Sequence, residues 1–211
     1  RKNYRQLSEE ETRRLRLEHS SLYVFGGEES YGYSGSDFVR DKDGNSAAVM
    51  ISEVAAYAKS RQLTLISLMD EIYCEFGYYL ERGESLTMDG AEGAAQIKSL
   101  VKSYASHPPE SLDGTPVDHL RNFATDEIFD SEGVRIPSEA MLMITLTDKR
   151  RVAVRPSGTE PKIKYYLFAS EIPAANASFS LTELAAAKPR VAASLDQLWQ
   201  EIKADSTKRL G

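Results

Sequence analysis

The chain has 211 residues, of which 41% are hydrophobic and 27% charged, and its formal net charge is -6 at pH 7. This length allows one or two domains with their own cores, and the acidic balance argues against nucleic-acid or anionic-membrane binding, because a polyanion is repelled by like charge. No apolar run reaches the roughly 18 residues of a membrane helix, and the single cysteine fits a reducing, cytoplasmic compartment.

Helical periodicity dominates the first third of the chain. Ser8 and Glu11 form a capping-box pattern that predicts a short charged helix to about Glu18. A short apolar run at 22–25 predicts a strand that leads into a glycine-rich loop. One helix is expected to start near Asn45, and Thr64 is expected to cap another. Their apolar stripes are interpreted as core surfaces: Ala47, Met50, Ile51, Val54 and Ala58 in the first, and Leu65, Leu68, Met69, Ile72, Tyr73 and Phe76 in the second.

Extended segments dominate the remainder. Residues 78–87 are predicted to be extended, and Asp89 with Glu92 is predicted to cap a helix that buries Ile97, Val101 and Tyr104. The alternating runs 142–146 and 152–154 predict a hairpin, with a further strand at 163–167. The remaining expectations are a loop at 106–116, a short strand at 120–123, irregular chain or a short helix from Ser180 within 173–190, and a terminal helix that includes Val191 and Trp199.

These patterns predict an α+β protein divided near residue 75. Residues 1–75 supply one convincing strand and three helices, too little for a closed sheet, and are interpreted as the C-terminal part of an α/β domain. Residues 76–211 are predicted to form a self-sufficient domain with a small antiparallel sheet and helices packed on one face.

The segment 155–161 has the chemistry of an anion-binding loop. Arg155 offers a planar fork of donors, Ser157 and Thr159 offer hydroxyl groups, and Gly158 lets backbone N–H groups approach a ligand closely. Basic residues outnumber acidic ones from Asp148 to Lys164. A polar turn with a solvated basic rim is the alternative, but a phosphate-bearing ligand accounts for more of these residues.

A second candidate loop follows the first predicted strand. Glu28 can accept hydrogen bonds from vicinal sugar hydroxyls, and Ser30 can add another from the same loop. Arg40 and Lys42 add positive charge nearby, which suits an anionic ligand. Taken alone, a solvated glycine-rich turn is an equally good interpretation of this loop.

The order of these loops resembles the α-D-phosphohexomutase family, and its phosphoglucomutase branch most closely. The resemblance rests on Gly-Glu-Glu-Ser at 27–30, on 35–44, and on Arg-Pro-Ser-Gly-Thr-Glu-Pro at 155–161, and it covers about 8–170. Family enzymes have four domains, so the resemblance implies the end of the third and the whole fourth. The sequence starts with neither Met nor an apolar leader, which also leads us to expect a piece of a longer chain.

The resemblance implies a role for each candidate residue. Glu28 and Ser30 would contact the sugar ring, and Arg40 and Lys42 would lie near the reacting phosphate, with Lys42 as a possible proton-transfer group. Arg155, Ser157, Gly158 and Thr159 would hold the non-reacting phosphate. The reaction implied is interconversion of hexose 1-phosphate and hexose 6-phosphate through a bisphosphorylated sugar.

The family's phosphoserine loop and aspartate Mg²⁺ site are absent from these 211 residues. The segments around Ser106 and Asp41–Gly44 imitate them, but the first lies downstream of the sugar loop and the second has Lys42 between its carboxylates. We therefore expect no metal in this chain, Mg²⁺ and glucose 1,6-bisphosphate in the full enzyme, the missing N-terminal domains as partners, and no mutase activity here. The alternative is a stand-alone, non-catalytic phosphosugar-binding module.

Overall fold

The computed structural model describes residues 6–19, 25–28, 31–35, 41–130, 133–158 and 160–211. The chain separates into two compact units, residues 1–68 and 69–211. The domain boundary expected near residue 75 stays a prediction. No helix in the described ranges is both long enough and apolar enough to cross a membrane.

The first unit contains α1 (Glu9–His19), a two-stranded hairpin, and α2 (Gly44–Ser60), and α3 (Leu65–Phe76) begins in it. The predicted helix starts are confirmed, because Ser8 Oγ accepts a hydrogen bond from the Glu11 N–H at 3.1 Å and Thr64 Oγ1 accepts one from the Ser67 N–H at 3.0 Å. Asp43 caps α2 by accepting from the Asn45 N–H.

The glycine-rich loop expected to start at Gly26 is instead part of that hairpin. Strand β1 (Gly26–Glu28) pairs antiparallel with β2 (Gly32–Ser34), and Glu28 lies opposite Gly32. Most of the strand predicted at 22–25 lies outside the described residues. Glycine weakens a strand pattern in the sequence, but backbone pairing requires no side chain, so the hairpin forms.

The apolar stripes of α2 and α3 are not core surfaces in this structure, which corrects that prediction. Ala58 is the buried residue of α2, and no residue of α3 is buried. Met69 is 46% exposed and Phe76 is 62% exposed. A two-stranded hairpin provides too little apolar area to cover two amphipathic helices.

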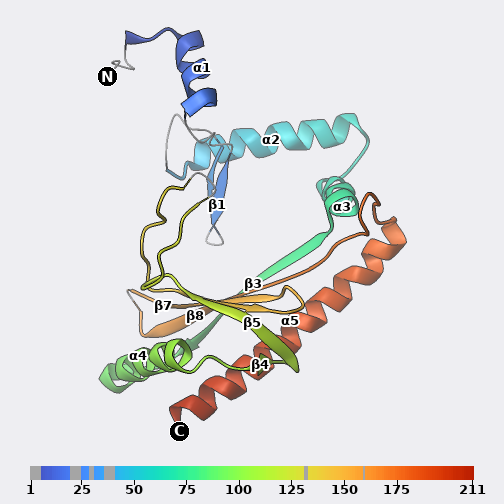
Figure 1. The fold of residues 1–211 in the computed structure, drawn as a ribbon. Coiled ribbons are helices and arrows are strands. Elements are labelled where there is room, and N and C mark those ends of the chain that lie inside the picture. The colour runs from blue at the N-terminus through green and yellow to red at the C-terminus, as the bar shows by residue number, and fades with distance from the viewer. Residues whose placement is uncertain (1–5, 20–24, 29–30, 36–40, 131–132, 159) are drawn as a thin grey trace. The chain divides into compact units, whose positions relative to one another are not determined.

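The second unit is built on a six-stranded antiparallel sheet in the order β3-β8-β7-β6-β5-β4 (Figure 1). Strand β3 spans Tyr78–Thr87, which confirms the extended segment, and β8 spans Lys162–Glu171. The predicted hairpin is β6 (Leu142–Leu146) with β7 (Arg151–Pro156). Beyond β6 lie β5 (Thr115–Asn122) and the edge strand β4 (Ser111–Leu112), so the loop predicted at 106–116 and the shorter strand at 120–123 are corrected.

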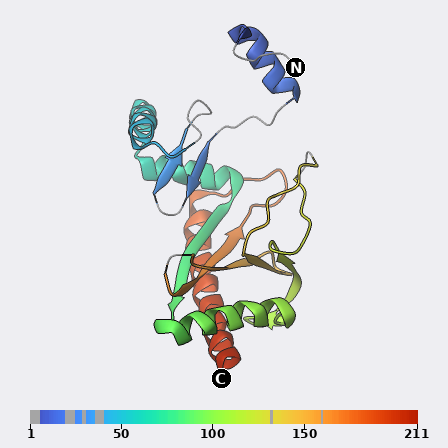
Figure 2. The ribbon, with the colours of Figure 1, turned by 90° about the vertical axis from the view of Figure 1, so that its left-hand side faces the viewer.

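Helices α4 (Gly90–Ser106) and α5 (Leu181–Leu210) cover one face of this sheet (Figures 1 and 2). The core lies between them and alternate residues of the strands, such as Val152, Val154 and Tyr165. The α+β class, with helices on one face of a small antiparallel sheet, is confirmed.

Both helices start where the sequence predicts, after Asp89 and Ser180, but the predicted capping bond of the first and the predicted length of the second are wrong. Asp89 occupies the N-cap of α4 but makes no side-chain capping bond. The region after Ser180 is one continuous helix of 30 residues that passes through Pro189. Ser180 and Glu183 form a complete capping box, and a long buried stripe from Leu184 to Ile202 offsets the hydrogen bond lost at proline.

Candidate functional site

The anion-loop candidate joins the ends of β7 and β8. Arg155 and Pro156 belong to β7, so the connecting loop is shorter than the sequence motif. The loop is closed by a hydrogen bond from the Ser157 N–H to the Lys162 carbonyl at 2.9 Å, and Ser157 Oγ accepts from the Glu160 N–H at 3.3 Å. Thr159 lies outside the described residues. These two hydrogen bonds therefore fix the position of Ser157 within the loop.

Arg155 lies on the sheet face opposite the helices. Its strand neighbours Val154 and Pro156 pair with Tyr165 and Ile163, and it pairs with Lys164 across β8. Both Arg155 and Lys164 therefore project from the uncovered face, because side chains alternate along a strand. Two adjacent cations beside the Ser157 loop make this edge attractive to an anion.

Glu139 forms an ion pair with the Arg155 guanidinium in this structure. Arg155 Nη2 lies 2.7 Å from Glu139 Oε1, and the two side chains are 49% and 46% exposed. An exposed pair of this kind is worth about 0–1 kcal/mol, so an anion of higher charge can displace the carboxylate. The sequence motif gave no sign of Glu139, which comes from an irregular segment before β6.

Gly158 is not required by the protein's own packing. A Cβ built there meets no atom within 4 Å. Nearby, Lys162 lies 2.6 Å from Glu160 and lowers the pKa of that carboxyl group, first by hydrogen bonding and then by charge, with Lys164 adding to the effect. Glu160 is thus ionised at neutral pH and neutralises part of the local positive charge.

The sugar-site candidates Glu28 and Lys42 meet over Gly32. Lys42 Nζ lies 3.8 Å from Glu28 Oε1 and 3.2 Å from Asp41 Oδ1. A Cβ at Gly32 would lie 2.5 Å from Glu28 Oε1 and would collide with the Lys42 side chain. A side chain at Gly32 would therefore require Glu28 and Lys42 to move, a contact that the sequence motifs did not indicate. Ser30 and Arg40 lie outside the described residues.

Acidic neighbours stabilise the charged form of Lys42. Hydrogen bonding and charge from Asp41, followed by the charge of Glu28, raise the pKa of Lys42 above its usual value. A lysine is protonated at neutral pH without any shift, and the raised pKa makes Lys42 a weaker acid whose positive charge can stabilise a nearby anion. It cannot accept a proton until it has lost one.

The two segments that imitate the family's phosphoserine and metal loops, around Ser106 and at Asp41–Gly44, make structural contacts. Asp43 accepts hydrogen bonds from the Asn45 N–H and Ser46 Oγ at the start of α2, and Asp41 pairs with Lys42. At the end of α4, Arg209 Nη1 donates to the His107 carbonyl at 2.8 Å. In the part of the chain that the structure describes, no cluster of three or more His, Cys, Asp or Glu side chains could hold a metal ion.

Comparison with known proteins identifies the relatives of this chain. Residues 12–76 match the family model for phosphoglucomutase/phosphomannomutase, alpha/beta/alpha domain III. The phosphoglucomutase of Staphylococcus aureus strain MSSA476 is 33% identical over 155 residues, which are 71% of this chain and 28% of that protein. The phosphoglucomutase of Staphylococcus haemolyticus strain JCSC1435 is 33% identical over 156 residues, covering 72% and 28%. The predicted resemblance to the C-terminal portion of the phosphohexomutase family is confirmed.

The fold agrees with that phosphohexomutase relationship. A crystal structure of pp63/parafusin from Paramecium, an exocytosis-sensitive phosphoprotein described as a phosphoglucomutase and captured in an open form, superposes with a TM-score of 0.52. It is 17% identical, and the match covers 88% of this chain and 31% of that protein. The chain spans 28% of the length of the curated phosphoglucomutases given above. Glu28, Gly32 and Lys42 fall inside the domain III match.

Proposed function

We propose that this chain is the substrate-holding C-terminal part of a cytoplasmic phosphoglucomutase or phosphomannomutase that interconverts hexose 1-phosphate and hexose 6-phosphate. The observation that carries the proposal is the placement of Arg155 beside Lys164 at the rim of the Ser157–Gly158 loop. A planar guanidinium beside a second cation, a hydroxyl group and an open glycine suits a phosphate dianion. Thr159 would add a second hydroxyl group.

In this proposal each of the two candidate sites binds a different part of the ligand. The loop at 157–161 and Arg155 hold the phosphate that does not react, so their binding energy orients the sugar. Glu28, with Ser30, accepts hydrogen bonds from ring hydroxyl groups. Lys42, which pairs with Asp41, and Arg40 stabilise charge at the reacting phosphate, and Lys42 can donate a proton to the departing sugar oxygen.

The remaining parts of the reaction are assigned outside this chain. Mg²⁺ would supply charge neutralisation during phosphoryl transfer, but the described residues offer no cluster of ligands for it. We assign that site, the phosphoserine and the handling of the glucose 1,6-bisphosphate intermediate to N-terminal domains of the same enzyme. The absence of their motifs from the sequence also favours a second candidate, a non-catalytic phosphosugar-binding module.

Replacing Arg155 by Lys tests the phosphate site. A charge-assisted bidentate contact contributes about 1.5–3 kcal/mol, and lysine keeps the charge but loses the fork. We expect inorganic phosphate to bind about fivefold more weakly or worse, measured by isothermal titration calorimetry. Arg151→Lys is the matched control, because Arg151 lies on the same face of β7 but stacks 5.4 Å from the Phe168 ring. Equal phosphate affinity in the folded Arg155→Lys protein and the wild type would refute the proposal.

Replacing Glu139 by Gln tests whether this carboxylate competes with the ligand. The exposed Arg155–Glu139 pair must be broken or shared when phosphate binds, and such a pair is worth up to about 1 kcal/mol. We expect Glu139→Gln to tighten phosphate binding about two- to fivefold. Glu127→Gln controls for the change in net charge, since Glu127 pairs with Arg135 instead. Weaker binding to Glu139→Gln would mean that Glu139 positions Arg155 and does not compete for it.

A further inference from the structure

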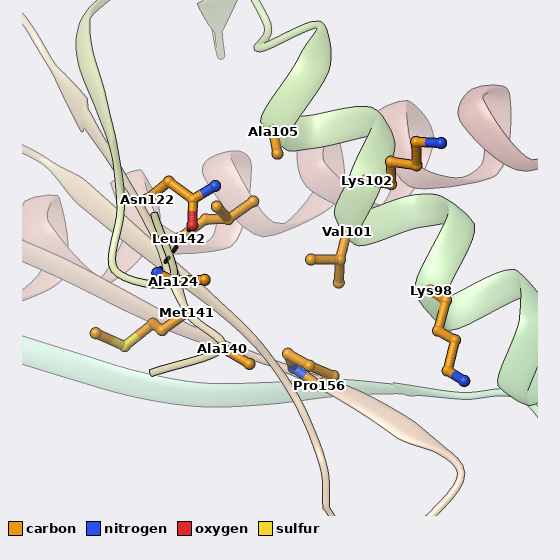
Figure 3. Close-up of a pocket in the computed structure, with 10 residues that line it drawn as sticks. All are labelled: Lys98, Val101, Lys102, Ala105, Asn122, Ala124, Ala140, Met141, Leu142 and Pro156. Atoms are coloured by element: carbon orange, nitrogen blue, oxygen red, sulfur yellow. Dashed lines mark hydrogen bonds between the residues drawn. The ribbon is translucent and has the colours of Figure 1, made fainter. Parts of the chain in front are cut away.

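A separate cavity of about 270 Å³ lies between α4 and the strand ends of the second unit (Figure 3). Val101 and Ala105 line it from α4, and Leu142 and Met141 line it from the start of β6. Pro156 closes it beside the end of β7. Ligand pockets for drug-sized molecules begin at about 300 Å³, so this cavity fits a single ring or a short chain.

The apolar residues of α4 extend beyond those that are buried in the core. Leu100 and Tyr104 are buried, at 0% and 1% exposure, and pack against the strands. Val101 was expected in the core but is only partly buried, as is Ala105, and both lie at the edge of the core. An apolar surface is thereby left partly open to water, and covering it is favourable.

Two lysines on α4 border this apolar surface. Lys98 and Lys102 lie four residues apart, so they are neighbours on the helix and repel each other. The positions three and four residues away carry Ala94, Ala95, Ser99, Val101, Ala105 and Ser106, none of them acidic. Neither lysine has an ion-pair partner among the described residues. Both lysines line the cavity, and Figure 3 shows their ammonium groups directed away from the other lining residues. A rotation of these long, exposed side chains would bring the ammonium groups to the mouth of the cavity.

Asn122 adds a neutral donor to the opposite wall. Its Oδ1 accepts a hydrogen bond from the Ala124 N–H at 3.0 Å, drawn as a dashed line in Figure 3. This bond fixes the orientation of the amide, because an N–H donor must face the oxygen. The amide NH₂ group of Asn122 then remains as a donor, and no described residue accepts from it.

We propose that this cavity is a binding site for a small monoanion with an apolar body, either an aryl carboxylate or a carboxylate whose apolar chain is longer than that of propanoate. The ring or chain would lie against Val101, Ala105 and Leu142, while the carboxylate remains at the mouth and is met by Lys98, Lys102 or the Asn122 amide. Inorganic phosphate does not fit this description, because it has no apolar part to bury. The site is thus chemically distinct from the Arg155 loop, although Pro156 borders both.

The test uses three probes and reads the protein directly. The 211-residue chain, labelled at the methyl groups of Val, Leu, Ile and Met, is titrated with 3-phenylpropanoate, 3-phenyl-1-propanol and propanoate while methyl NMR spectra are recorded. Phenylpropanoate should give saturable shifts at Val101, Met141 and Leu142. The neutral alcohol should bind at least about threefold more weakly, because it lacks the carboxylate. Propanoate should not saturate the protein, because it lacks the phenyl ring.

Variants separate the apolar and charged parts of the site. Ala105→Leu should fill the cavity and reduce phenylpropanoate affinity at least about fivefold. Met141→Gln, on the opposite wall, serves the same purpose if Ala105→Leu does not fold. The double variant Lys98→Gln/Lys102→Gln should lower the affinity for the carboxylate to that for the alcohol. Lys203→Gln/Lys208→Gln on α5 removes the same charge elsewhere and should have no effect.

Two outcomes would overturn the proposal. Absence of saturable shifts at the cavity methyl groups with every probe would show that there is no site. Equal affinities for phenylpropanoate and the alcohol, unchanged in the Lys98→Gln/Lys102→Gln variant, would show that the cavity does not select an anion. Neither result depends on phosphate or sugar binding, so the proposed mutase role is not at issue in this test.

Discussion

The 211-residue chain alone is expected to convert no glucose 1-phosphate to glucose 6-phosphate. Phosphoryl transfer depends on a nucleophile and on charge neutralisation at the transferring group. The family-type serine loop and aspartate loop are absent from the sequence, and the described residues contain no cluster able to hold a metal ion. In the proposed function the candidate residues hold and orient a phosphosugar, and none of them is assigned to carry its phosphate.

The assay supplies glucose 1-phosphate, glucose 1,6-bisphosphate and Mg²⁺, and follows glucose 6-phosphate through a coupled dehydrogenase. A full-length staphylococcal phosphoglucomutase, which resembles this chain over part of its length, is the positive control. Turnover proportional to the concentration of the chain would contradict the prediction. If Ser106→Ala then abolished that turnover, the serine at the end of α4 would have to be reconsidered as the phosphorylated group.

The sheet of the second unit was largely predictable, because its strands follow a simple periodicity. Alternation at 142–146 and 152–154 placed one face toward a core, and the structure pairs these strands as a hairpin. The course of α5 through Pro189 was not predictable from the local pattern. Proline disfavours a helix interior, and only the tertiary burial of residues such as Leu195 and Leu198 outweighs it.

The candidate sites were predictable in residue type but not in pairing. The guanidinium of Arg155 and the carboxylate of Glu28 were recognisable, because a guanidinium suits phosphate and a carboxylate accepts hydrogen bonds from sugar hydroxyl groups. The Arg155–Glu139 pair was not, since Glu139 belongs to no motif and approaches only through the fold. The proximity of Gly32 to Glu28 and Lys42 was missed for a related reason, since it also arises only from the folded hairpin.

Replacing Arg150 by Met is expected to destabilise the second unit by about 2–3 kcal/mol. Arg150 is 9% exposed at the turn between β6 and β7. Its guanidinium donates to Asp148 at 2.7 Å, to Asp113 at 2.8 Å, and to Thr115 Oγ1 and the Ser194 carbonyl. Burial acts to lower the pKa of Arg150, but the hydrogen bonds to Asp113 and Asp148 outweigh this effect and raise it.

The size of the effect follows from what the substitution leaves behind. Methionine keeps the apolar part of the side chain but leaves the carboxylates of Asp113 and Asp148 near each other without a cation. Breaking a fully buried pair costs about 3–5 kcal/mol, and the expected cost is smaller because Asp113 and Asp148 remain 28% and 40% exposed and can be partly hydrated.

Urea unfolding of Arg150→Met, monitored by Trp199 fluorescence, measures this loss directly. Arg151→Met is the matched control, since the next side chain lies on the exposed face of β7 and should change the free energy of unfolding by less than about 0.5 kcal/mol. Because Arg150 fixes the start of β7 and Arg155 lies at its end, the folded Arg150→Met protein should still bind phosphate. Equal unfolding free energies in the two variants would show that the cluster is structurally dispensable. Loss of phosphate binding in a folded Arg150→Met protein would instead show that the hairpin turn controls the placement of Arg155.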